Sequence, residues 1–115
     1  MCDSDSIVAT GKMQTFKKFL ASAGSTPIFA FFYSPSCGHC ITLKRHFDTY
    51  RSKCQSSKQK VIIIYINKET ASEIFQHYNI TSWPQVMIFK NNKKIDHIIG
   101  ADVEKLQYAF KKVGL

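Results

Sequence analysis

Residues 28–40 of the chain read IFAFFYSPSCGHC, and the rest of the sequence is interpreted outward from this stretch. Its first six residues form a continuous apolar run, which is typical of a central strand covered on both faces. Cys37 and Cys40 follow, separated by two residues, a spacing at which two thiols can close a disulfide within one helical turn. If the strand delivers them to the start of a helix, the free N–H groups and the helix dipole favour a thiolate, the form that attacks disulfides. The pattern therefore predicts thiol–disulfide exchange.

The segments on either side alternate between helical and strand periodicity, which predicts an α/β domain. Helices are expected over 13–23, over 40–54, from a capping box at 70–73 to about Tyr78, and over 103–113 with Asp102 near its start. Strands are expected at 28–33, 61–66, 85–90 and 94–99, the last two joined as an antiparallel hairpin through Asn91 and Asn92. We expect a single domain over residues 1–115, in which residues 1–9 form either a mobile tail or a short first strand at Ile7 and Val8.

Composition and charge narrow the class of protein. The chain has 115 residues, enough for one domain with its own core, and 44% of them are hydrophobic. The formal net charge is +8, but lysines and arginines are spread along the chain, so a nucleic acid is not expected as the main ligand. No stretch approaches the roughly 20 apolar residues that cross a bilayer, and neither end reads as a secretory or retention signal. We therefore expect a monomeric cytoplasmic protein that binds neither nucleic acid nor membrane.

With this order of elements the chain resembles the thioredoxin family. Residues 32–40, FYSPSCGHC, are similar to the active-site segment of protein disulfide isomerase domains, which share the Gly-His dipeptide. Residues 78–86, YNITSWPQV, lie where the family carries its cis-proline loop, and residues 89–92 and 99–101 match its closing hairpin and the turn into its last helix. The resemblance extends from about residue 10 onward. It implies an α/β thioredoxin fold, with a central mixed β-sheet flanked by helices.

The resemblance also implies roles for the residues of the CxxC motif. Cys37 would be the nucleophile, and Cys40 would resolve the mixed disulfide that Cys37 forms with a substrate. His39, where thioredoxins usually have proline, would tune the pair, because a donor or positive charge beside the sulfur stabilises the reduced form and makes the disulfide a better oxidant. Gly38 would let a partner chain approach closely.

Two further residues are expected to contact the substrate. Pro84 resembles the family's cis-proline, which faces the CxxC motif and leaves the backbone of the preceding residue free to pair with an extended substrate. That preceding residue is Trp83, which is bulkier than the residue usual in the family. Three interpretations stay open for Trp83: an apolar platform for substrates, a restriction of access, or a core tryptophan.

The chain departs from the family pattern at two positions. Phe31 stands six residues before Cys37, where the family buries an Asp or Glu that moves a proton to and from the resolving thiol. Its absence predicts slower release of mixed disulfides, with water or His39 assisting Cys40 instead. Ser36 stands where the family usually has tryptophan, so the apolar surface beside Cys37 is smaller. The other cysteines are expected to be structural (Cys54, on the buried face of its helix) or an inert thiol in the tail (Cys2).

These observations predict a protein-disulfide oxidoreductase that reduces disulfides in protein substrates, with no cofactor and no metal. Its reductant would be a thioredoxin reductase or glutathione. One alternative is a disulfide isomerase or oxidase of a secretory compartment, as the Gly-His dipeptide suggests. Another is a weakly redox-active binding module that uses the groove at Trp83 and Pro84. A zinc site lacks the usual second ligand pair, and haem attachment fails because Ile41 follows Cys40.

Overall fold

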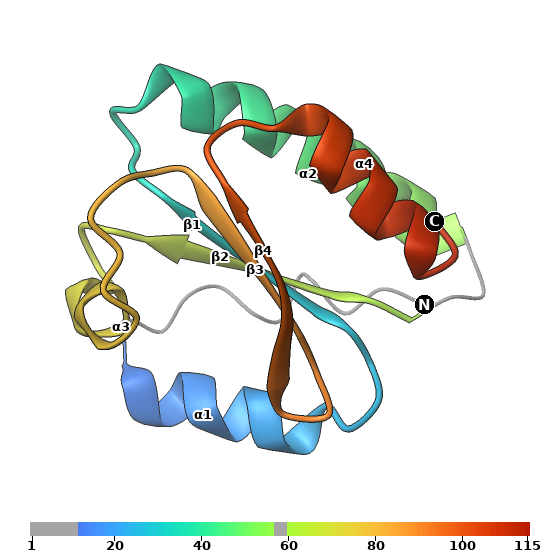
Figure 1. Ribbon diagram of the computed structural model, residues 1–115, viewed down its shortest axis with the longest axis horizontal. Coiled ribbons are helices and arrows are strands. Elements are labelled where there is room, and N and C mark those ends of the chain that lie inside the picture. The colour runs from blue at the N-terminus through green and yellow to red at the C-terminus, as the bar shows by residue number, and fades with distance from the viewer. Residues whose placement is uncertain (1–11, 57–59) are drawn as a thin grey trace.

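The computed structural model describes residues 12–56 and 60–115, and in this part of the chain four strands form a mixed sheet with two helices on each face (Figure 1). In chain order the elements are α1 (Met13–Ser22), β1 (Ile28–Tyr33), α2 (Gly38–Ser56), β2 (Ile62–Asn67), α3 (Ser72–His77), β3 (Gln85–Lys90), β4 (Lys93–Ile99) and α4 (Val103–Lys112). The predicted mixed sheet flanked by helices is confirmed. No helix in the described ranges is both long and apolar enough to span a membrane.

The strands are arranged in the order β2-β1-β3-β4, so that β1 lies inside the sheet. It pairs in parallel with β2 and antiparallel with β3, and β3 pairs antiparallel with β4. The hairpin between β3 and β4 turns through Asn91 and Asn92, whose φ angles are +54° and +62°. Two successive positive φ values are the signature of a type I′ turn, which asparagine tolerates well. The predicted hairpin is therefore confirmed.

Side chains alternate between the two faces of β1, and each face has its own core. Ala30 and Phe32 pack in a cluster with residues from α1 and α3, whereas Phe29 and Phe31 pack in a cluster with residues from α2 and α4. Figure 1 shows the same arrangement, with α1 and α3 on one side of the sheet and α2 and α4 on the other. Because helices cover both faces, the strand is apolar at every position rather than at every second one.

The packing of α2 against the sheet follows the predicted apolar stripe. Cys40, Leu43, Phe47 and Tyr50 are all buried on one side of this helix. The side chain of Cys54, the last predicted member of the stripe, lies outside the part that the structure describes, as do Cys2 and the proposed strand at Ile7 and Val8.

The start of α3 differs from the prediction. Residues 70–73 were expected to form a capping box, but the N-cap position is Ala71 and no side chain caps the helix there. Asn67, at the end of β2, organises this turn instead: its side-chain Oδ1 accepts from the N–H of Glu69 at 2.9 Å, and its carbonyl accepts from Ala71 at 2.8 Å. The capping-box prediction was wrong because the four-residue pattern also fits a turn that the preceding strand closes. The strand β2 itself begins one residue later than predicted.

Candidate active site

A tight turn connects β1 to α2 and sets the position of Cys37. The N–H of Cys37 donates to the carbonyl of Ser34 at 3.2 Å, which closes a four-residue turn with Pro35 at its second position. Proline favours that position because its φ angle is already suitable. The N–H of Ile41 then donates to the carbonyl of Cys37 at 3.2 Å, so Cys37 lies directly at the start of α2.

The two thiols have different environments. The Cys37 side chain is half-buried, whereas Cys40 is only 2% exposed, and both cysteines are free thiols. The backbone N–H of Cys40 donates to Sγ of Cys37 at 3.2 Å. Burial, followed by the hydrogen bond with the Cys37 thiol, raises the pKa of Cys40 to about 12, while the backbone at Ser34 opposes this rise. The accessible sulfur is therefore that of Cys37, and the buried one holds its proton firmly.

The loop before β3 lies against Cys37. The Trp83–Pro84 peptide bond is cis, and the carbonyl oxygen of Trp83 accepts from the Cys37 thiol at 3.8 Å. Pro84 is buried, and its carbonyl accepts from the N–H of Gly100 at 2.9 Å. The fold thus brings the CxxC motif and this loop together although 42 residues lie between Cys40 and Trp83 in the sequence. Gly38 and His39 are exposed at the first turn of α2.

Trp83 has both a core side and a solvent side. It is half-buried and packs against both hydrophobic clusters, with its ring 6.2 Å from that of Phe75. The ammonium group of Lys68 lies 4.7 Å from the centre of the indole ring. Cation–π contacts of this kind hold a lysine over an aromatic face. Trp83 is therefore a partly exposed residue that packs against both cores, and its expected contact with substrates stays a prediction.

The loop that contains Trp83 and Pro84 is supported by a series of hydrogen bonds that the sequence did not predict. The side-chain amide of Gln85 donates to both the carbonyl and the hydroxyl of Ser82, at 3.0 and 3.1 Å. Its oxygen lies 2.8 Å from Nε2 of His97, so this nitrogen is the donor, and Nδ1 accepts from Lys94 at 3.4 Å. Burial and then Lys94 lower the pKa of His97, against the opposing charge of Asp96. The only sequence signal was a glutamine at the start of an otherwise apolar strand.

The hydrophobic cluster that contains Cys40 is rich in aromatic side chains. Phe31 is fully buried in the same cluster as Cys40, with its ring 5.3 Å from Tyr33 and 4.8 Å from Phe47. The ring of Tyr65 meets its edge at 5.9 Å. Where the resemblance led us to look for a carboxylate, this chain therefore has a stack of rings that provides no base.

Ser36, the second departure from the family pattern, is exposed. Its hydroxyl lies 3.2 Å from that of Ser34, which is buried, so a hydrogen bond between the two serines spans the turn before Cys37. A tryptophan at this position would present a broad apolar surface, which this turn lacks.

Comparison with known proteins agrees with this geometry. The thioredoxin family model matches residues 7–112. The thioredoxin of Ophiophagus hannah is 31% identical over 102 residues, covering 89% of this chain and 93% of that protein. The thioredoxin of Gallus gallus is 26% identical over 107 residues, covering 93% of this chain and 98% of that protein. Among solved structures, Fasciola hepatica thioredoxin superposes with a TM-score of 0.81 at 18% identity, covering 93% of this chain and 98% of its own.

The solved structure supports the fold, and the family match over most of the chain supports the activity. Together with the CxxC pair at the start of α2, these findings show that the chain belongs to the thioredoxin family and is a thiol–disulfide oxidoreductase.

Proposed function

We propose that the protein reduces disulfides in protein substrates, with Cys37 as nucleophile and Cys40 as resolving thiol. The observation that carries this proposal is the contrast between the two cysteines. Cys37 is accessible and receives an N–H hydrogen bond on its sulfur, which stabilises negative charge there. Cys40 is buried and its pKa is raised to about 12, so it cannot compete for the first attack.

Reduction of the substrate disulfide then proceeds in two steps. The Cys37 thiolate attacks a substrate disulfide, forming one new S–S bond and releasing one substrate thiolate. Cys40 loses its proton and attacks the Cys37 sulfur, which forms the Cys37–Cys40 disulfide and releases the second substrate thiolate. Two electrons pass to the substrate, and an external dithiol or thiol must return them.

A trapping experiment tests the roles of the two cysteines. In a background that carries Cys2→Ser and Cys54→Ser, the Cys40→Ser variant should accumulate a covalent complex with a disulfide-containing protein such as insulin. The matched Cys37→Ser variant should form none. Both are read by non-reducing electrophoresis with and without dithiothreitol. Equal trapping by the two variants, or trapping by Cys37→Ser alone, would refute the assignment.

His39 is proposed to set the redox potential of the pair, and Gly38 to allow close approach of the substrate chain. His39→Pro should then lower the potential measured in graded glutathione buffers, by up to the roughly 90 mV that separates protein disulfide isomerase from thioredoxin. A wild-type potential near that of the isomerase would favour the alternative role in oxidation or isomerisation. An unchanged potential in His39→Pro would show that His39 does not tune the pair.

Trp83 and Pro84 are proposed to bind the substrate backbone beside Cys37, a role supported by the 3.8 Å separation between the Trp83 oxygen and the Cys37 sulfur. Thioredoxins are reduced by thioredoxin reductase, and we propose that enzyme, or glutathione, as the reductant here. The monomeric state and the cytoplasmic location stay predictions. Relatives of this chain include proteins named as a mitochondrial and a chloroplastic thioredoxin.

A further inference from the structure

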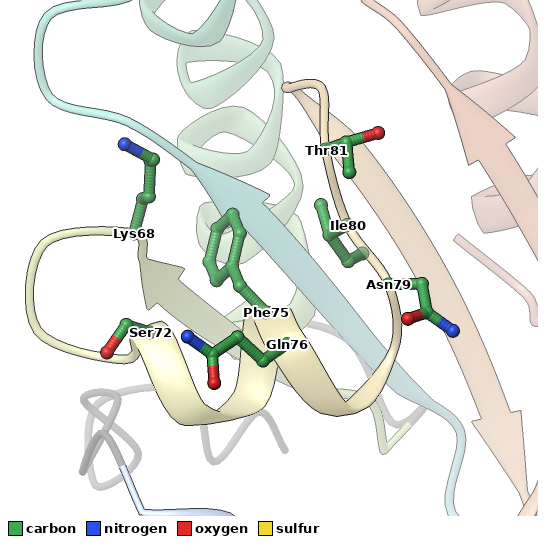
Figure 2. A pocket seen from close by; sticks show the side chains of 7 residues that line it. All are labelled: Lys68, Ser72, Phe75, Gln76, Asn79, Ile80 and Thr81. Atoms are coloured by element: carbon green, nitrogen blue, oxygen red, sulfur yellow. The ribbon is translucent and has the colours of Figure 1, made fainter.

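A pocket of about 510 Å³ lies between the end of β2, helix α3 and the segment that leads to Trp83. It is lined by Lys68, Ser72, Phe75, Gln76, Asn79, Ile80 and Thr81. Figure 2 shows the ring of Phe75 in the middle of this set, with Lys68 on one side and Ile80 and Thr81 on the other. The pocket thus combines an apolar centre with polar groups around it.

The polar groups all suit a negatively charged partner. Lys68 brings a positive charge, the amides of Gln76 and Asn79 can donate hydrogen bonds, and so can two hydroxyl groups. The residues that line the pocket include no carboxylate. Glu69 and Glu73 are nearby in the chain and exposed, but neither lines the pocket. Ion pairs between described residues join Lys44 to Asp48 and Lys112 to Asp96, and none of them involves Lys68.

One residue, Trp83, links the pocket to the reactive sulfur of Cys37. The Lys68 ammonium lies 4.7 Å from the centre of the Trp83 ring, and the ring of Phe75 lies 6.2 Å from it. The carbonyl of the same tryptophan lies 3.8 Å from Sγ of Cys37. A polypeptide joined to Cys37 that follows the surface of Trp83 therefore reaches the pocket. Because an extended chain advances about 3.3 Å per residue, the crossing takes about two to four residues.

We propose that this pocket binds an Asp or Glu side chain of the protein substrate, located within a few residues of the cysteine that reacts with Cys37. The inference rests on the proposed function and defines its substrate class: disulfide-containing proteins whose reactive cysteine has an acidic neighbour. The carboxylate would approach the Lys68 ammonium, while the methylene groups of the side chain pack against Phe75 and Ile80, which lie beside it in Figure 2. The formal net charge of +8 supports the same preference at longer range.

The test uses the full chain and disulfide peptides in matched pairs that differ by Glu against Gln at one position, scanned over about four residues on each side of the cysteine. At one or two positions kcat/KM should favour the Glu peptide by about two- to fivefold at low salt, as expected for a partly exposed ion pair. The preference should fall as salt is added. Lys68→Gln should abolish it, and Lys68→Glu should reverse it.

Lys90→Glu is the matched control, because it makes the same charge change at the other end of the sheet. The β1–β3 register pairs Phe89 with Ile28, the residue of β1 farthest from Cys37. This variant should keep the wild-type Glu preference. Equal rates for Glu and Gln peptides at every position, or an equal loss of preference in Lys90→Glu and Lys68→Glu, would overturn the proposal.

A binding measurement separates this proposal from the proposed function. Trp83 is the single tryptophan of the chain, so its fluorescence reports peptide binding at the site directly. Peptides in which serine replaces the cysteine cannot react, yet the Glu peptide should bind more tightly than the Gln peptide. If disulfide peptides are not reduced at all but this difference persists, the reductase function fails and the pocket stands. If they are reduced without any Glu preference in rate or binding, the pocket proposal fails alone.

Discussion

At the scale of single residues, the most consequential feature is a buried thiol that shares its hydrophobic cluster with Phe31, the residue at the position where the family carries a carboxylate. Cys40 is 2% exposed, its pKa is raised to about 12, and it belongs to the same hydrophobic cluster as the ring of Phe31. A resolving thiol must lose its proton before it can attack. In this chain the proton has to leave toward water or a surface group, because the neighbouring rings cannot accept it.

We therefore expect resolution of the mixed disulfide to depend steeply on pH. Burial, the largest cause of the raised pKa of Cys40, persists in the mixed disulfide, so the thiolate stays a small fraction that grows about tenfold per pH unit, and the resolution rate should grow with it between about pH 6 and pH 9. Stopped-flow release of the second thionitrobenzoate from the thionitrobenzoate adduct of Cys37 measures this rate.

Two variants at Phe31 sharpen that prediction. Phe31→Asp introduces a carboxylate and should flatten the profile, whereas the apolar control Phe31→Leu should keep the wild-type slope. A wild-type rate that does not change with pH over this range would contradict the argument.

His97 should make the stability of the protein depend on pH. Burial and Lys94 lower its pKa from 6.5, so the fold favours the neutral ring, whereas the unfolded chain takes up a proton more readily. This contribution to stability is complete above about pH 6.5 and is lost as the pH falls toward the lower pKa of the folded state. Urea titrations from pH 7 to pH 5 should show a steeper loss of unfolding free energy in the wild type than in His97→Gln. Parallel curves would show that His97 is not responsible.

At the scale of elements, the turn between β2 and α3 depends on one side chain. Asn67 holds it through the hydrogen bond from the Glu69 N–H to Oδ1 at 2.9 Å, and no side chain caps α3. Asn67→Ala should lower the free energy of unfolding by about 1 kcal/mol, since one hydrogen bond of this kind is lost. Thr70→Ala should change it by less than about 0.5 kcal/mol. Denaturant titration measures the unfolding free energy of both variants. A larger loss in Thr70→Ala than in Asn67→Ala would show that a capping box does stabilise the start of α3.

At the scale of the whole molecule, α4 and α2 are joined to the sheet through Phe110. Its ring stacks on Phe29 of β1 and on Tyr50 of α2, each with a centroid distance of 4.1 Å, and meets the edge of Phe47 at 5.7 Å. Phe110→Ala should lower the unfolding free energy by about 3–5 kcal/mol, because it leaves a cavity where three elements meet. Tyr108→Ala, at a position 63% exposed on the same helix, should change it by no more than about 1 kcal/mol. Similar losses in the two variants would show that the stack is not what holds the layers together.

The sequence alone was sufficient to predict the helices, strands and turns that depend on residues close to one another in the chain. The apolar run at 28–33, the helical stripe from Cys40 to Tyr50 and the two asparagines of the hairpin each predict an element that the structure contains. The CxxC motif and the distant proline predicted the family, since they report a local chemistry and an element order that few folds share. The start of α3 was missed because a capping box and a strand-closed turn have the same residue types, and only the position of Asn67 distinguishes them.

What only the tertiary structure decided are the contacts between residues far apart in the sequence. Three contacts depend on how the strands pair. They are the proximity of Trp83 to Cys37, the series of hydrogen bonds from His97 through Gln85 to Ser82, and the position of Lys68 over the indole ring. Periodicity shows which face of an element is apolar, but not which side chain of another element it will meet. Register and layer packing determine that, because they place residues of β3 and β4, and the residue that follows β2, around one loop.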